Sequence, residues 1–551
     1  MTQVVASEKL QPLVKEYMQT IFKAAPNYAA YLGLHEYDGQ LPDISAAAFV
    51  EWANQQRDLL RRLEAVNLDP NDKEAAFDKA LLELNLKKGI FDIEEIQSYR
   101  TNPMFYADVL EVSGYIKRDY APLEQRVNSM IRQLEQIPDA LGHARANLNQ
   151  VLPKPALETA LIIYQGVITY LESDVTEAVE VAQNADLSNR FQTARDMTIM
   201  AVKHFVQFLE SRLSTANYDF AIGPDKYRKM LAWGEGVDFS LEKVLEVGER
   251  NLAANKATLE GVVAEFAPGK TVPEVMREMG QQHPSPATLV PETIVGLEAT
   301  RQFLLDHNIV SVPSEVRCLV KESPPFMRWA FASMDAPGPF EQVATQAYYY
   351  LTPVEPEWSE QQKEEWLTKF DYFTLQDVSV HEAYPGHYLH FLHTKLVNSQ
   401  LRQMLFSYSF VEGWAHYVEQ MMLEEGFANT DSRFRLAQLS EALLRNSRYV
   451  ASLKMHTQGM TVDEATRFIM ENAYMEETPS RSEAVRGTFD PGYLNYTLGK
   501  LLLLKLREDY KREQGTNYSL RQFHDTVLSY GAPPVPLLRK VMLQHDDGQI
   551  L

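Results

Sequence analysis

Helical periodicity is the feature that most narrows the folds open to this 551-residue sequence. Apolar residues recur at helical spacing through long stretches, as at 73–97. Capping signals recur as well: Ser240 precedes an amphipathic run, and Thr271 and Thr461 each stand three residues before a glutamate, the pattern of a capping box. Further amphipathic helices are expected at 123–148, 156–185 and 190–213. The sequence therefore predicts a mainly α-helical fold.

Strand-like alternation is scarce and is confined to two short segments, 314–320 and 347–351. Both come shortly before a histidine-rich region, so we expect a small β-sheet beside the helix that carries those histidines. A loop-rich stretch begins near Tyr218. We therefore expect a two-lobed helical fold, with an N-terminal helical half at 1–217 and a C-terminal catalytic half at 218–551, and the two halves can still share one core.

Composition excludes several classes of partner. The formal net charge is −22, and nucleic acids and anionic membranes are bound by basic surfaces, so neither is expected as a partner. No run approaches the roughly 18 apolar residues of a membrane span. The N-terminus lacks a signal-peptide pattern, and the single cysteine, Cys318, excludes an intramolecular disulfide. We expect a cytoplasmic protein with a peptide or small-molecule substrate; the sequence does not indicate its oligomeric state.

Two histidines and a glutamate form the best candidate for a catalytic site: His381, Glu382 and His387. In the common helical zinc motif the histidines lie about four residues apart and share one face. Here they are six apart, which in a regular helix would turn the two rings about 120° from each other. We expect Pro385 and Gly386 to form a bulge that returns His387 to the face of His381. The alternative is that they end one helix and that His387 begins another.

A third ligand is expected from the apolar helix predicted at 406–426. Glu412 lies on this helix, far enough after His387 for the chain to complete a helix, turn and return. A buried carboxylate needs a partner, and a metal ion supplies one. The sequence therefore predicts a Zn²⁺ site formed by His381, His387 and Glu412.

Four neighbouring polar residues keep more than one interpretation. His390 and His393 continue the helical phase of His387 and could bind the metal directly or support a ligand, but such residues are more often ordinary helix histidines. His416 and Glu419 share a stripe with Glu412. On an exposed helix that stripe would be solvated surface.

Residues 378–387 read VSVHEAYPGH, and this string resembles the signature of the bacterial domain of unknown function 885. Weaker likenesses at 32–38 (LGLHEYD), 102–106 (NPMFY) and 222–227 (IGPDKY) extend the resemblance over nearly the whole chain. That family is similar to the gluzincin metallopeptidases: the thimet oligopeptidases, the angiotensin-converting-enzyme group and the thermostable carboxypeptidases. The resemblance implies a large, helical, metallopeptidase-like fold and a zinc cofactor.

The resemblance also implies roles for single residues. His381 and His387 match the zinc histidines, and Glu382 matches the general base. Residues 410–415, FVEGWA, look like the helix whose glutamate, here Glu412, is the third ligand.

A block near the C-terminus, RGTFDPGYLNY at 486–496, also resembles the family. Tyr496 best matches the tyrosine with which the gluzincins stabilise an oxyanion, and Tyr493 is the second choice. Arg486 could bind the carboxylate of a substrate, or form an internal salt bridge. The chain departs from the family at Tyr388 and Tyr493, where the family often has His and Gln, which leaves the metal site intact but puts the fine substrate preference in doubt.

The predicted activity is that of a zinc-dependent hydrolase, a metallopeptidase of carboxypeptidase or oligopeptidase type that cleaves short peptides. Glu382 would move a proton from water to the leaving amine, and Tyr496 would donate a hydrogen bond to the oxyanion. Tyr349 lies on a segment that either pairs with an extended peptide as an edge strand or forms a buried core strand. Two other classes stay open: a metal-dependent hydrolase of a non-peptide amide or ester, and a helical binding protein with a structural or vestigial metal site.

Overall fold

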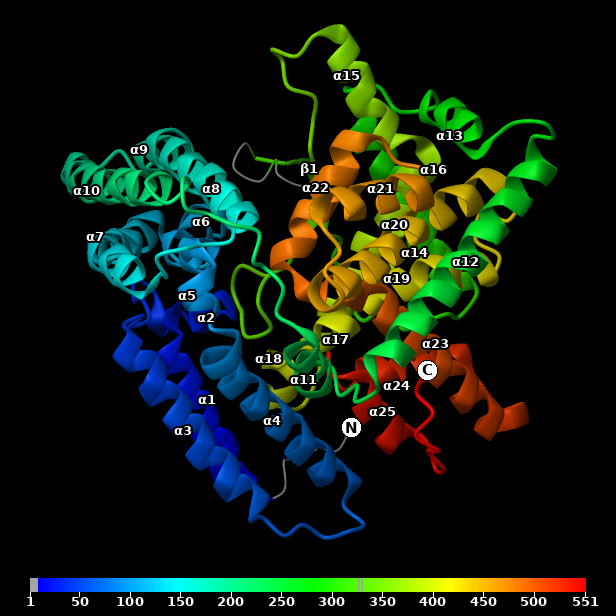
Figure 1. Cartoon of the computed structure of the whole chain (residues 1–551), viewed down its shortest axis with the longest axis horizontal. Coiled ribbons are helices and arrows are strands. Elements are labelled where there is room, and N and C mark those ends of the chain that lie inside the picture. Colours follow the sequence, from blue (N-terminus) through cyan, green and yellow to red (C-terminus); the bar gives the residue numbers. More distant parts are fainter. Residues whose placement is uncertain (1–7, 325–327, 329–330) are drawn as a thin grey trace. The chain divides into compact units, whose positions relative to one another are not determined.

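The computed structural model describes residues 8–324, 328 and 331–551, and it is mainly α-helical with a small sheet (Figure 1). The chain divides into two compact units. The N-terminal unit contains residues 8–220 and a short returning segment, Pro337–Thr345. The C-terminal unit contains Ala221–Ala336 and Gln346–Leu551. The returning segment could not be predicted from the sequence, because a few residues within a loop carry no compositional signal.

Helices build the N-terminal unit, and they are coloured from blue through cyan to blue-green in Figure 1. In chain order they are α1 (Gln11–Ala24), α2 (Pro26–Tyr31), α3 (Ala46–Glu64), α4 (Lys73–Phe91), α5 (Ser98–Thr101), α6 (Ser113–Lys117), α7 (Leu123–Asn147), α8 (Lys154–Glu172), α9 (Asp174–Glu180) and α10 (Ala185–Glu210). The helix expected at 73–97 is α4 followed by a π-helical turn, Asp92–Ile96. The helix expected at 156–185 is two helices, because the backbone of Ser173 leaves the helical region.

The C-terminal unit holds the remaining helices. They are α11 (Pro224–Gly234), α12 (Leu241–Phe266), α13 (Val272–Gly280), α14 (Leu289–Asp306), α15 (Glu360–Leu367), α16 (Tyr372–Glu382), α17 (His387–Thr394), α18 (Gln400–Met404), α19 (Tyr408–Glu424), α20 (Ser432–Thr457), α21 (Val462–Ala473), α22 (Glu477–Phe489), α23 (Asn495–Gln514), α24 (Leu520–Leu528) and α25 (Val535–Met542). The cap at Ser240 and the capping boxes at Thr271 and Thr461 are confirmed. Helix α20 is central: it contacts α12, α16, α19, α21, α22 and α23. No described helix is both long and apolar enough to cross a membrane.

The sheet has three short strands in the order β1-β3-β2: β1 (Leu319–Glu322), β2 (Ala332–Asp335) and β3 (Tyr348–Leu351). Strand β3 lies between a parallel neighbour, β1, and an antiparallel neighbour, β2. The interpretation of 347–351 as an edge strand is therefore wrong, because both sides of β3 are already paired. Strand β2, which the sequence did not predict, is at the edge of this sheet and contacts α16.

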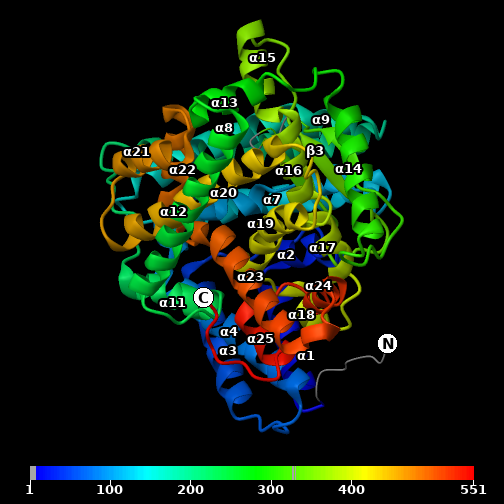
Figure 2. The ribbon, with the colours of Figure 1, turned by 90° about the vertical axis from the view of Figure 1, so that its right-hand side faces the viewer.

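Two glycines allow α19 and α23 to approach backbone to backbone; Figure 2 shows the two helices side by side. A Cβ atom on Gly499 would lie 1.7 Å from the carbonyl oxygen of Ser409, and one on Gly413 would lie 2.5 Å from the Cα of Gly499. Only glycine fits so close an approach. This contact fixes the position of Glu412 on α19 relative to Tyr496 on α23.

Candidate metal centre

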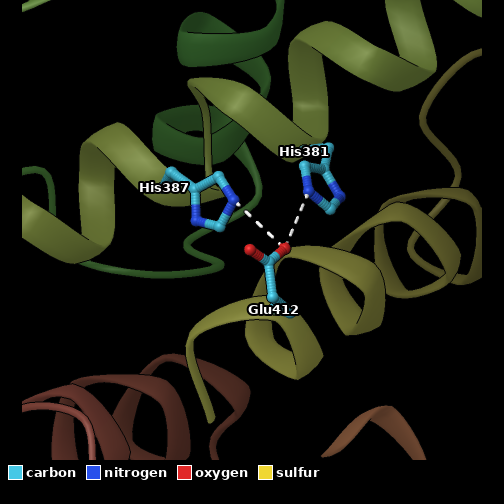
Figure 3. A group of neighbouring side chains, drawn as sticks. All are labelled: His381, His387 and Glu412. Atoms are coloured by element: carbon cyan, nitrogen blue, oxygen red, sulfur yellow. Dashed lines mark ion pairs between the residues drawn. The ribbon is translucent and has the colours of Figure 1, made fainter. Parts of the chain in front are cut away.

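Three side chains from three helices converge in the C-terminal unit (Figure 3). An Oε2 atom of Glu412 lies 3.5 Å from Nε2 of His381 and 3.6 Å from Nε2 of His387. Their potential ligand atoms all lie within 4.8 Å of one another, and the described residues contain one such grouping of His, Cys, Asp and Glu. Ligands about 2 Å from a tetrahedral zinc are about 3.3 Å apart. The spacing therefore fits a bound metal ion.

The two histidines meet across a break between helices, and the bulge expected within a single helix is wrong. Helix α16 ends at Glu382, and α17 begins at His387. The amide of Gly386 donates to the carbonyl of Val380 at 3.0 Å, which folds the turn back onto the end of α16. A new helix direction re-aims His387 without any distortion of a continuous helix.

Close contacts hold this turn in place. A Cβ atom on Gly386 would lie 1.7 Å from the carbonyl oxygen of His381, so the position requires glycine. The indole N–H of Trp414, on α19, donates to the carbonyl of Pro385 at 2.9 Å. The same helix that carries Glu412 therefore also holds the turn that aims His387.

Glu419 orients the His381 ring through Nδ1, the ring nitrogen that does not face Glu412. Its Oε1 atom lies 2.7 Å from Nδ1 of His381, and its Oε2 atom lies 2.8 Å from Nδ1 of His416. The guanidinium of Arg445 approaches Oε1 at 3.3 Å and balances the buried charge. When Nδ1 of a neutral imidazole donates to a carboxylate, its Nε2 lone pair is left for a metal. Glu419 is thus a positioning residue, and its place seven residues after Glu412 was the only signal for it in the sequence.

The other neighbouring histidines lie outside the converging group. His416 is bonded through Nδ1 to Glu419 at 2.8 Å. His393 bonds through Nε2 to the carbonyl of Ser311 at 2.8 Å. Burial lowers the pKa of His390 and of His416 to about 3, so both rings are neutral. These histidines are core residues that support the helices around the centre.

Charge at the centre favours a cation. Burial opposes the charged form of His381, but hydrogen bonds to Glu412 and Glu419 outweigh it and raise the pKa of the ring to about 10 in the metal-free protein. Burial likewise acts to raise the pKa of Glu412, but the two histidines outweigh it and lower that pKa. Glu412 is therefore ionised over the physiological range.

Glu382 has a different environment. Burial raises its pKa above the usual value, while His387 and His381 act in the opposite direction, as does a hydrogen bond from the Met334 backbone on β2. A carboxylate with a raised pKa is a better proton acceptor near neutral pH. Glu382 adjoins the converging group without belonging to it.

Tyr496, on α23, contacts residues of α19 and α20. Burial, followed by the charge of Glu412, raises the pKa of its phenol. Its ring lies 5.8 Å from that of Tyr408, one turn before Glu412 on α19. The guanidinium of Arg448 lies 5.5 Å from the Tyr496 ring. A neutral phenol in this position can donate a hydrogen bond.

Tyr493 and Arg486 are already engaged within the protein. The Tyr493 hydroxyl donates to the carboxylate of Glu483, and its side chain is buried. This removes the second-choice oxyanion donor, because its proton is already committed. The Arg486 guanidinium pairs with Asp490 at 3.3 Å and stacks 4.4 Å from the Tyr493 ring. Its side chain is still 42% exposed, so a ligand can reach it.

The structure does not place Tyr349 at a substrate surface. This residue lies on the central strand β3, is fully buried, and has its hydroxyl 3.2 Å from that of Ser379 on α16. It supports the helix that carries His381, so the prediction that it binds substrate is wrong. The strand residue beside Glu382 is Met334.

The protein therefore has a mainly helical fold of two units, and its C-terminal unit carries a cluster of two histidines and one glutamate. The family described as "Bacterial protein of unknown function (DUF885)" matches residues 26–542, and the chain belongs to that family. No curated protein is significantly similar to it in sequence.

Two solved structures share the fold. A predicted lipoprotein of unknown function from Shewanella oneidensis is 24% identical, with a TM-score of 0.82 over 98% of this chain and 100% of that chain. A predicted lipoprotein from Colwellia psychrerythraea is 18% identical, with a TM-score of 0.81 over 98% of each chain. At these identities the likeness establishes the fold alone.

Proposed function

We propose that this protein is a zinc-dependent hydrolase, with His381, His387 and Glu412 as its metal ligands. The observation that carries the proposal is their convergence next to Glu382. Two imidazole nitrogens and one carboxylate oxygen are a common ligand set of catalytic zinc, which leaves a position for water, whereas structural sites are usually closed by four protein ligands. When bound, zinc supplies Lewis-acid polarisation of water and of a carbonyl oxygen.

Glu382 acts as the general base in this proposal. It accepts a proton from the attacking water and delivers it to the leaving group. Two features support this role: its position directly after His381, and a pKa raised chiefly by burial. The Met334 amide holds one side of the carboxylate and limits its rotation.

Tyr496 stabilises the oxygen that gains negative charge. Burial, followed by the charge of Glu412, raises the pKa of its phenol, so the hydroxyl stays protonated. One such donor contributes about 3 kcal/mol to the transition state in comparable sites. The close contact between α19 and α23 holds the hydroxyl in place, so little reorganisation accompanies the reaction.

A peptide is the substrate class that these features favour. Strand β2 is an edge strand beside Glu382, and an extended peptide can pair with such an edge. The accessible guanidinium of Arg486 lies in the same Tyr-rich cluster as Tyr496 and fits a C-terminal carboxylate. The likeness to the gluzincin metallopeptidases that we expect for this family would support the same assignment. A non-peptide amide or ester is the second candidate, because the same groups serve its hydrolysis.

The test begins with metal content. The purified protein is expected to contain one zinc per chain, and hydrolysis of a peptide library is expected to stop with chelator and return with zinc. Glu382→Gln should lower kcat by about 10²–10⁴ while it retains zinc. Glu471→Gln, an exposed glutamate of α21, is the control. A Glu382→Gln variant with full activity overturns the proposed mechanism, and activity on amides or esters without peptide cleavage selects the second candidate.

A further inference from the structure

A buried carboxylate at the end of α11 meets the first turns of two longer helices of the C-terminal unit. Glu235 is the residue that follows α11, and it is only 5% exposed. Its Oε2 atom accepts hydrogen bonds from the Ser407 hydroxyl and, at 3.0 Å, from the Ser409 amide. Its Oε1 atom accepts from the side-chain amide of Asn495 at 3.3 Å. One oxygen is therefore bonded to α19 and the other to α23.

The surroundings of Glu235 suit a buried negative charge. All three of these partners are donors, which an ionised carboxylate can accept without competition. Ser407 caps α19 and Asn495 is the first residue of α23, so the carboxylate lies at the N-terminal ends of both helices. The unpaired amides at a helix N-terminus favour a negative charge. The two helix ends thus offset the penalty of burying the carboxylate.

Glu412 lies between two points at which α19 is attached to its neighbours. Ser409, which precedes it, is bonded to Glu235. Gly413, which follows it, lies against α23, where its added Cβ would be 2.5 Å from the Cα of Gly499. The metal ligand expected on this helix is therefore held on both sides along the chain.

Tyr496 lies between the equivalent points of α23. Asn495, directly before it, is buried and is bonded to Glu235. Gly499, one turn after Asn495, lies against α19, where its added Cβ would be 1.7 Å from the carbonyl oxygen of Ser409. Two helices that touch at one place can still pivot about it, and a second attachment at their N-terminal ends removes that freedom.

We propose that Glu235 is a positioning residue of the candidate active site: its carboxylate ties the first turn of α19 to that of α23 and so fixes Glu412 relative to Tyr496. Glu235 itself contacts no substrate in this role. The consequence for catalysis rests on the proposed function, because only a hydrolase uses Tyr496 as an oxyanion donor. The tie between the two helices does not depend on that function.

Hydrogen exchange on the full-length protein tests the tie between the helices. Glu235→Ala removes both attachments, whereas Asn495→Ala removes only that of α23. In Glu235→Ala the amides in the first turns of α19 and α23 are expected to exchange several-fold faster, and in Asn495→Ala those of α23 alone. The matched control is Glu464→Ala, which removes a carboxylate that accepts from the Thr461 amide at 2.8 Å at the start of α21. It should leave α19 and α23 unchanged.

Two results of the exchange measurement overturn the proposal. If Glu235→Ala speeds exchange in α19 alone, the carboxylate caps one helix and does not tie two; if neither helix changes, it has no positioning role. Should Glu235→Ala fail to fold, Asn495→Ala decides the matter, and unchanged exchange in α23 of that variant overturns the proposal.

Kinetics test whether the tie acts through Tyr496. With any substrate that the wild-type protein hydrolyses, Asn495→Ala should lower kcat several-fold while KM and zinc content stay nearly unchanged. In the Tyr496→Phe background the same substitution should lower kcat much less, because the hydroxyl that it positions is already gone. Equal losses in the two backgrounds would overturn the effect on Tyr496. Absence of hydrolysis by the wild type would count against the proposed function only, because the exchange measurement needs no substrate.

Discussion

Two histidine–carboxylate pairs, one in each unit, have nearly the same geometry and different consequences. His381 meets Glu419 at 2.7 Å, and His35 meets Glu341 at 2.8 Å. In the first pair the other ring nitrogen faces a second histidine and a carboxylate. In the second pair it faces Asp38. A histidine–carboxylate pair alone does not identify a candidate metal site, because such a pair can also hold two segments together. The groups that face the other ring nitrogen of the histidine make the difference.

Each of the two rings interacts with two carboxylates. Glu419 has Arg445 at 3.3 Å as a counter-ion, so its charge is compensated even without an imidazolium. Asp38 and Glu341 both approach His35 and favour its protonated form. Glu412 and Glu419 likewise favour the protonated form of His381, so a metal ion has to displace that proton. Only the His381 ring has a second histidine and a carboxylate beside its Nε2 that can hold the ion with it.

The largest expected effect is a difference in zinc content between variants that lack one or the other histidine. His381→Ala should lose stoichiometric zinc, because one of three ligands is gone, whereas His35→Ala should retain it. Elemental analysis of the two purified variants, with folding checked by circular dichroism, measures this. Full zinc occupancy in folded His381→Ala would exclude the residue as a ligand.

Substitution of the carboxylate that is bonded to each ring should produce a smaller difference in zinc binding. Glu419→Gln is expected to weaken zinc affinity by about 10–100-fold, because His381 loses the acceptor that fixes its tautomer and orientation. Glu341→Gln should leave zinc affinity unchanged. Competition with a chromophoric chelator measures both variants, and equal affinities in the two would contradict a positioning role for Glu419.

The smallest effect is a pH dependence of stability at the second pair. Burial opposes the charged ring, but hydrogen bonds to Asp38 and Glu341 raise the pKa of His35 above the usual 6.5, so its contribution is lost as pH rises through that raised pKa. Burial acts to raise the pKa of Glu341, but His35 and two backbone amides lower it below the usual 4.5, so its contribution is lost as pH falls through the lowered pKa. The pair therefore stabilises most between these values.

The difference in Tm between wild type and His35→Ala should accordingly be larger near pH 5.5 than near pH 8.5. Thermal unfolding at the two pH values, with His283→Ala as the control, measures it; that variant removes a histidine–glutamate pair of the C-terminal unit, with Nε2 3.2 Å from Glu364. A difference that is the same at both values, or larger at the higher one, would show that the pair acts without its charge.

Much of the local structure follows from short-range signals. The caps at Ser240, Thr271 and Thr461 form as predicted, because a side-chain oxygen satisfies helix amides only a few residues away. The α-helical class follows from the periodicity of the sequence. The types of residue at the candidate metal centre were also visible, since His, Glu and a Pro-Gly pair lie within one short segment.

Predictions were wrong where a residue's role depends on contacts with other segments, because the local sequence does not show which segments will lie beside it. Alternation at 347–351 predicted a strand, but its central place depends on β1 and β2, which are distant or weakly patterned. Tyr349 and Tyr493 looked available because their partners, Ser379 and Glu483, lie elsewhere in the chain. The same holds for Glu341 in the segment Pro337–Thr345, whose partner is His35.

The sequence by itself determined which chemical groups this protein has and where its helices begin. The sequence also predicted the grouping of His381, His387 and Glu412, but tertiary structure decided how the three side chains converge. The reason is physical: the direction of His387 depends on a turn closed by Gly386, and the reach of Glu412 depends on the packing of α19. Such packing arises from contacts between segments far apart in the chain, which no local pattern encodes.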